Sequence, residues 1–136
     1  MTTLNDTSLF AALAKFEAEW PGSEWSWDGR MCCVTSSFTD ASGDMARAVT
    51  LAALPTEYTS MNIATASAPL REFIDRSGGL RKGQFLFVRE DLARVTFGLW
   101  WPWGGGTPTS LRLGLFGVEE NAEPNRRLRE IFNVAG

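Results

Sequence analysis

Histidine is absent from this 136-residue chain, and the absence excludes more chemistry than any other feature of the composition. Without histidine there is no Ser-His-Asp or Cys-His nucleophile pair, and most zinc and non-haem iron sites are excluded. The chain has two cysteines, Cys32 and Cys33, and neighbouring cysteines cannot build a disulfide framework. No nucleotide or other cofactor motif is present either. We therefore expect neither a metal nor a cofactor.

Long hydrophobic runs are missing as well. No segment approaches the roughly 18 apolar residues of a membrane-spanning helix. The first residues, MTTLNDTSLF, lack the basic and apolar regions of a signal peptide. With cysteines that suit a reducing compartment, these features predict a cytoplasmic protein with no membrane partner. Eleven arginines against two lysines are typical of a GC-rich bacterial gene.

Clustered basic charge, the signature of nucleic-acid binding, is also missing. The net charge is −3, with eight acids and three bases in residues 1–66 and eight acids and ten bases in residues 67–136. Arginines between residues 71 and 94 alternate with Phe73, Phe85 and Phe87, a mixture known from single-strand binders. Helix and strand periodicity assigns these phenylalanines to the core. We expect no nucleic-acid partner.

What the sequence does contain is the composition of one globular domain, residues 1–136, with 44% hydrophobic and 21% charged residues. Residues 56–66 show no clean period and are expected to be loop or irregular helix. Helical spacing and end signals predict helices over residues 6–19, about 69–77 and about 124–135. Alternation predicts strands over residues 30–38, 46–54, 84–91, 94–101 and 111–116.

These elements predict an α+β fold in the order α-β-β-α-β-β-β-α. Adjacent strands joined by tight turns favour an antiparallel sheet of about five strands, built from two hairpins and a meander. Helices at the N-terminus, the middle and the C-terminus would cover one face. The order resembles that of many small proteins, among them bacterial toxin-immunity proteins and secretion chaperones, without a shared residue motif.

The six tryptophans fall into two clusters of three, and strand alternation places Trp100 and Trp101 on opposite sides of the sheet. Trp101 shares the side of Leu99 and is expected in the core. Trp100 is expected to share an open, polar side with Arg112. Because burying an indole is worth several kcal/mol, something should cover Trp100. The cover is the same chain, a second copy in a homodimer, or a different partner.

The first functional hypothesis is a non-enzymatic protein that binds another protein. The partner would be a toxin or a secreted effector, as for toxin-immunity proteins and effector chaperones. Arg112 and Trp103 would anchor the partner, while acidic side chains steer it. The predicted contact surface joins the 100–112 hairpin to an acidic turn and comprises Glu24, Trp25, Trp27, Asp28, Trp100, Trp103 and Arg112.

Two alternatives belong to other classes. In a small-ligand-binding protein, Trp100, Trp103 and Arg112 would line a pocket closed by residues 56–66, with the arginine holding an anionic or polar group. In an enzyme without histidine, Tyr58 would work with a carboxylate such as Glu57. No residue is assigned a catalytic role.

Overall fold

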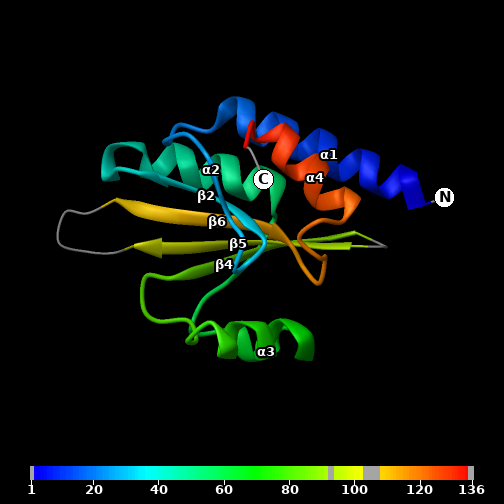
Figure 1. Ribbon diagram of the computed structural model, residues 1–136. Helices are drawn as coiled ribbons and strands as arrows, with labels where there is room; N and C mark the ends of the chain where they lie inside the picture. The colour runs from blue at the N-terminus through cyan, green and yellow to red at the C-terminus, as the bar shows by residue number, and fades with distance from the viewer. Residues whose placement is uncertain (1, 92–93, 103–107, 135–136) are drawn as a thin grey trace.

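The structure is a computed structural model that describes residues 2–91, 94–102 and 108–134. Within these residues the chain forms four helices and a six-stranded antiparallel sheet (Figure 1). The predicted α+β class is confirmed, with one strand more than expected. Short 3-10 helices occupy Asp40–Ser42 and Ile63–Thr65. The elements are α1 (Thr2–Glu19), β1 (Ser26–Asp28), β2 (Cys33–Phe38), α2 (Gly43–Ala53), β3 (Thr56–Tyr58), α3 (Ala68–Arg76), β4 (Phe85–Asp91), β5 (Arg94–Pro102), β6 (Thr109–Leu115) and α4 (Glu123–Ile131).

The prediction of a strand over residues 46–54 was wrong, because residues 46–53 belong to helix α2. Ala46, Val49 and Ala53 are buried at a spacing of three and four residues, which is the period of one helix face. Alanine also has the highest helix propensity. Helix α1 begins at Thr2, four residues before its predicted start, and the segment 56–66 contains the short strand β3.

The strands lie in the order β1-β2-β6-β5-β4-β3, and each strand runs antiparallel to its neighbours. Strands β5 and β6 form the centre of the sheet. Strands β1 and β3 form its two edges and have three residues each. The tight turn after Asp28 joins β1 to β2 as a hairpin.

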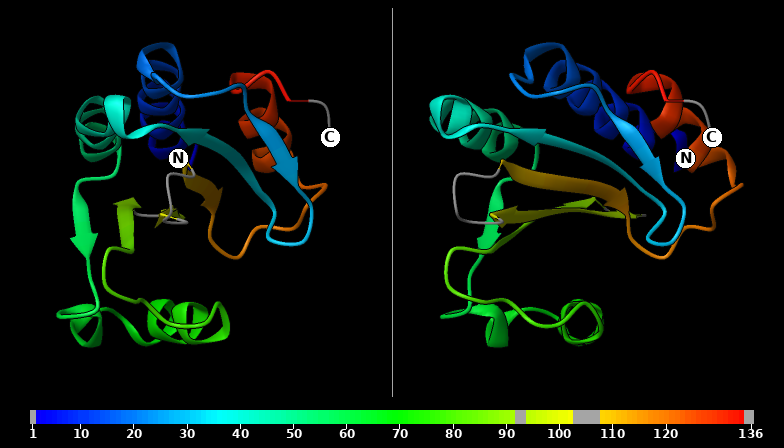
Figure 2. Two further views of the ribbon diagram at one scale, coloured as in Figure 1. Left: turned by 90° about the vertical axis from the view of Figure 1, so that its left-hand side faces the viewer. Right: turned by 60° about the vertical axis from the view of Figure 1, so that its left-hand side comes forward.

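Both faces of the sheet are covered, whereas the sequence predicted helices on one face. Helices α1, α2 and α4 lie on one face and α3 on the other, as the views from several sides agree (Figures 1 and 2). Two separate cores result. The three-helix core contains Leu9, Leu13, Phe16, Val34, Phe38, Leu54, Phe87, Trp100, Leu111, Leu113 and Leu128, and the α3 core contains Cys33, Leu70, Ile74, Leu86, Val88, Phe97 and Leu99.

Gly114 marks the closest approach within the α3 core. It pairs with Cys33 on β2 and with Phe97 on β5. A Cβ atom at Gly114 would lie 2.7 Å from Cζ of Phe97 and 3.0 Å from Cβ of Cys33. The ring of Phe97 is fixed in turn by Phe73 of α3, with ring centroids 4.8 Å apart. Glycine at this position therefore lets the ring of Phe97 lie directly over the backbone of β6.

Substitution Gly114→Ala should reduce the free energy of unfolding by about 1–3 kcal/mol, because the added methyl group overlaps a buried ring. Gly43→Ala is the matched control, since nothing lies within 4 Å of its would-be Cβ and its φ of −58° is helical. That variant should be neutral or stabilising by up to about 1 kcal/mol. Urea unfolding measures both, and equal stabilities of the two variants would contradict the packing described for Phe97.

Candidate functional site

Trp100 is buried, and the prediction that its side of the sheet is open was wrong. Its exposed fraction is 8%, and its ring lies 4.7 Å from the ring of Phe38 and 5.7 Å from that of Phe87, measured between centroids. The side of β5 that carries Trp100 faces helices α1, α2 and α4. Trp101, expected in the core, is half-buried on the opposite side, against the α3 core. Trp100 is therefore a core residue and not a contact surface.

Arg112 lies on the other face of the sheet from Trp100, because it pairs with Leu99 on β5 and Thr35 on β2. Its Nε is 3.6 Å from Oδ2 of Asp28, and the two side chains are 29% and 25% exposed. Oδ1 of Asp28 accepts hydrogen bonds from the backbone N–H groups at positions 30 and 31. Arg112 on β6 and Asp28 on β1 are thus engaged with each other across strand β2, which lies between them.

Trp27 connects β1 to the C-terminal part of the chain. Its Nε1 donates a 2.9 Å hydrogen bond to Oε2 of Glu120, and the guanidinium of Arg129 lies 4.5 Å from its ring centroid. The Arg129 Nη1 also donates to the backbone carbonyl of Glu120. Trp27 therefore has partners within its own chain. Trp103, the other predicted anchor, lies outside the described residues.

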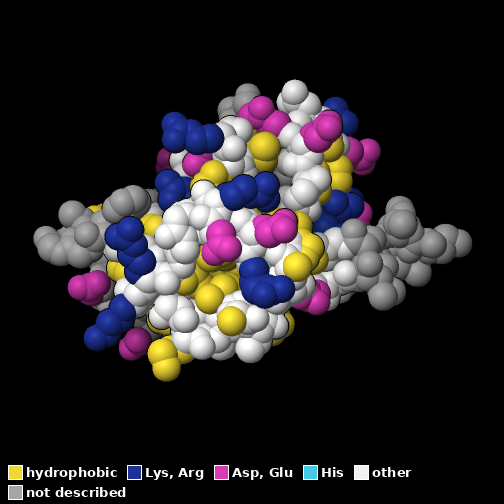
Figure 3. Space-filling model, turned by 90° about the horizontal axis from the view of Figure 1, so that it is seen from below, with side chains coloured by type: hydrophobic (Ala, Val, Ile, Leu, Met, Phe, Trp, Pro, Cys, Tyr) yellow, Lys and Arg dark blue, Asp and Glu magenta, His cyan; other side chains and the backbone are white. Residues whose placement is uncertain are grey.

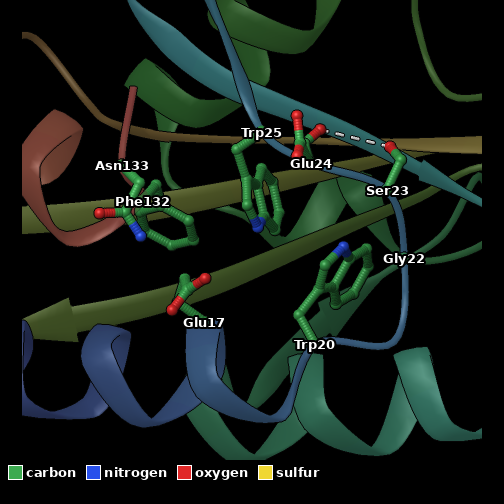
Figure 4. A pocket seen from close by; sticks show the side chains of 8 residues that line it. All are labelled: Glu17, Trp20, Gly22, Ser23, Glu24, Trp25, Phe132 and Asn133. Atoms are coloured by element: carbon green, nitrogen blue, oxygen red, sulfur yellow. Dashed lines mark hydrogen bonds between the residues drawn. The ribbon is translucent and has the colours of Figure 1, made fainter. Parts of the chain in front are cut away.

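A concave site lies where α1 ends, beside the end of α4. It is a cavity of about 390 Å³ (Figure 4). Two predicted contact residues, Glu24 and Trp25, line it. The described residues that line it are Glu17, Trp20, Gly22, Ser23, Glu24, Trp25, Phe132 and Asn133, and we call this site the Trp20–Trp25 pocket.

Close packing against β2 fixes one wall of the pocket. A Cβ atom at Gly22 would lie 2.5 Å from the carbonyl oxygen of Ser37, so only glycine allows the chain to pass this close. The N–H of Ser23 donates to that carbonyl at 2.8 Å, and the N–H of Ser37 donates to Oγ of Ser23 at 3.0 Å. Nε1 of Trp20 donates to Oγ of Ser36 at 2.8 Å. The wall is therefore formed before any ligand arrives.

Aromatic rings fix the other walls. The ring of Trp25 lies between Trp20 and Phe132, with centroid distances of 5.2 and 4.7 Å. Trp20 stacks on Phe16, with centroids 5.2 Å apart. Phe132 is buried, whereas the two indoles are half-buried and keep part of their surface toward the cavity. Large aromatic surface is thus held rigidly at the edge of the three-helix core.

Two carboxylates complete the lining. Glu17 projects from the last turn of α1 into the space between Phe132, Trp25 and Trp20 (Figure 4). Among the described residues, neither Glu17 nor Glu24 has a side-chain hydrogen bond or an ion pair, and no basic residue lines the pocket. Carboxylates beside aromatic faces attract cations. The pocket can therefore hold a positively charged group.

Sequence reasoning did not select Glu17, Trp20, Phe132 or Asn133. Glu17 has the spacing of a helix-surface acid, while Trp20 and Phe132 fit apolar helix stripes. One signal was present, namely three tryptophans among four acids between residues 17 and 28. Chain topology, which places the end of α4 beside the end of α1, supplies the rest.

The basic and aromatic residues between positions 71 and 94 do not form a separate site. Arg89 pairs with Asp91 at 3.0 Å and Arg94 pairs with Asp6 at 3.0 Å, while Phe87 is fully buried. On the face that carries α3, basic and acidic side chains are interspersed (Figure 3). Charge of one sign does not gather there.

Tyr58 and Glu57, the pair considered for acid–base chemistry, point to opposite faces of β3. Tyr58 packs against the α3 core, whereas Glu57 forms an ion pair with Arg47 of α2. The two side chains therefore do not meet. In the part of the chain that the structure describes, no three His, Cys, Asp or Glu side chains are grouped to hold a metal ion.

The adjacent cysteines differ in their surroundings. Cys33 is fully buried beneath α3, and this burial, with a smaller contribution from the charge of Asp28, raises the pKa of its thiol to about 12. Cys32 is half-buried just before β2, with a φ of 53°. Burial raises its pKa as well. Neither thiol is activated as a nucleophile.

No protein-family model, curated protein or solved structure matches the chain. The helices in the described ranges are too short or too polar to cross a bilayer.

Substitution Trp100→Ala should lower the free energy of unfolding by about 3–5 kcal/mol, as expected for a large core truncation. Trp101→Ala is the matched control on the neighbouring position and should cost less, because its ring is only half-buried. Denaturant unfolding monitored by far-UV circular dichroism measures both. A larger loss for Trp101→Ala would restore the assignment that the sequence suggested.

Alkaline pH should destabilise the protein through Cys33. The folded thiol titrates near 12 and the unfolded thiol near 8.5, so stability is complete below about pH 8.5 and falls as pH rises toward 12. The slope contributed is at most about 1.4 kcal/mol per pH unit. Urea unfolding between pH 8 and 10.5 should show this slope reduced in Cys33→Ala and kept in Cys32→Ala. Identical slopes in the two variants would contradict the burial of the Cys33 thiol.

Proposed function

We propose that this protein acts by binding another protein, and that the partner contacts the Trp20–Trp25 pocket. The observation that carries the proposal is the carboxylate of Glu17, which has no partner among the described residues and lies beside the half-buried rings of Trp20 and Trp25. Toxin immunity or escort of an effector remains the proposed kind of role. Such proteins need a stable scaffold and a complementary face, and no catalytic group.

The energetics of the pocket favour a protein contact. Tryptophan is enriched among the few residues that carry most of the binding energy at interfaces. Here two tryptophans are already ordered by hydrogen bonding and ring packing, so a partner would not bear the entropic cost of fixing them. The acidic rim would accelerate association with a basic partner through electrostatic steering.

A small cationic ligand is the second candidate. A volume of about 390 Å³ lies within the range of small-molecule sites. The protein partner is preferred because a second depression, of about 330 Å³, borders the same Gly22–Ser23 segment. The combined surface extends beyond what one small ligand would cover.

Site-specific photo-crosslinking tests the proposal. A photoreactive amino acid replaces Glu24, which is exposed at the rim, and the protein is irradiated in extract of the native host. We expect one crosslinked protein, and Glu17→Arg should reduce its yield at least tenfold, since a like charge would face the basic partner. Glu19→Arg, an exposed change on the same helix that is outside the pocket lining, should leave the yield unchanged.

A photoreactive residue at Glu72, on the exposed side of α3, serves as the positional control and should capture no such protein. Equal capture from both positions, or equal effects of the two arginine substitutions, would contradict the proposal. Crosslinking to a second copy of this chain would assign the surface to self-association in place of a different partner.

A further inference from the structure

We infer that the Trp20–Trp25 pocket receives the guanidinium group of an arginine that an extended segment of the partner presents. The inference rests on the proposed function and names the chemistry that the same site would recognise. It depends on three independent properties of the pocket, which are its charge, its aromatic surface and its unused hydrogen-bonding groups.

The charge of the lining selects a cation. Glu17 and Glu24 contribute two carboxylates, and the lining contains no lysine or arginine to neutralise them. An anionic ligand would be repelled by both. A neutral ligand could donate a hydrogen bond to Glu17 but would not balance its charge, so desolvating the carboxylate would cost more free energy.

The aromatic surface selects a planar cation over a compact one. A guanidinium stacks on indole faces and is more weakly hydrated than the ammonium of lysine, so it enters a half-buried aromatic site at lower desolvation cost. Its parallel N–H groups also match a single carboxylate in a two-pronged contact. Trp25 and Glu17 border the same space and supply these two features together (Figure 4).

The remaining polar groups fit the main chain of a peptide. Nε1 of Trp25 has no hydrogen-bond partner among the described residues, and it is turned toward the space between Glu17 and Trp20 (Figure 4). The side-chain amide of exposed Asn133 is likewise without a partner among the described residues. A guanidinium has only hydrogen-bond donors, so it cannot accept a hydrogen bond from Nε1 of Trp25. A peptide that presents an arginine supplies both the guanidinium and a backbone carbonyl that can accept this bond.

The neighbouring depression would receive the residues next to the arginine. It borders the pocket through Gly22 and Ser23, and its lining combines hydroxyl groups with the apolar surfaces of Pro21, Phe38 and Pro108. Gly22 and Ser23 thus belong to the lining of both hollows. An extended segment can therefore cross at this position.

Nuclear magnetic resonance of the tryptophan indole N–H groups tests the inference. The probes are N-acetyl-arginine N-methylamide, its neutral citrulline isostere and the corresponding lysine compound. We expect the arginine probe to shift the Trp20 and Trp25 signals saturably, about tenfold more tightly than citrulline and about threefold more tightly than lysine. The signal of Trp100 should not move.

Glu17→Gln should weaken the arginine probe about fivefold, because it removes a partly exposed charged partner while keeping the shape of the side chain. Glu19→Gln is the matched control and should leave the affinity unchanged. Both variants should keep the wild-type melting temperature within about 2 °C, which separates loss of binding from loss of folding. Equal affinities for arginine and citrulline, or equal effects of the two glutamine variants, would overturn the inference.

The two proposals fail in different ways. If a partner is crosslinked at position 24 in a Glu17-dependent manner but the arginine probe does not bind, protein binding stands and the guanidinium assignment falls. If the arginine probe binds in a Glu17-dependent manner but no protein is captured, the chemistry of the pocket stands and the protein partner falls in favour of a small ligand.

Discussion

Burial of both faces of the central strands is the constraint on which the rest of the structure depends. From Thr96 to Trp100, every residue of β5 is buried, so side chains of both orientations belong to a core. Aromatic residues in the middle of the sheet, such as Phe97 and Trp100, are therefore buried in the two cores and cannot contact a ligand. Trp20 and Trp25 stay partly open because they lie beyond the sheet, where the chain leaves α1. The position of the pocket follows from this division.

Sequence patterns predicted most element types because local periodicity and tertiary packing agree there. Residues 85–91 form a strand, one residue shorter than predicted from the continuous apolar run, and residues 6–19 lie in a helix. The prediction for residues 46–54 failed because the turn residues before them and Pro55 after them can bound a helix as well as a strand. The buried residues of this segment, Ala46, Val49 and Ala53, are spaced as on one face of a helix. Packing of that face against α1 stabilises the helix over a strand.

Less of the candidate site could be predicted. The acidic, tryptophan-rich segment before β1 drew attention to Trp25 and Glu24, which do line the pocket. The assignment of Trp100 failed because one covered face was assumed, and a second helical layer cannot be seen in the alternation of one strand. Phe132 lies more than one hundred residues from Trp25, so only the fold brings the two rings together.

The short edge strands determine how this molecule can associate. At three residues each, β1 and β3 offer another polypeptide little free backbone on which to build a further strand, and β4 continues past β3 with the charged Arg89–Asp91. Under the proposed function, contact with a partner would then depend on side chains. A lineage carrying this scaffold could change its partner by exchanging a few rim residues, with the strand pairing of the sheet unchanged.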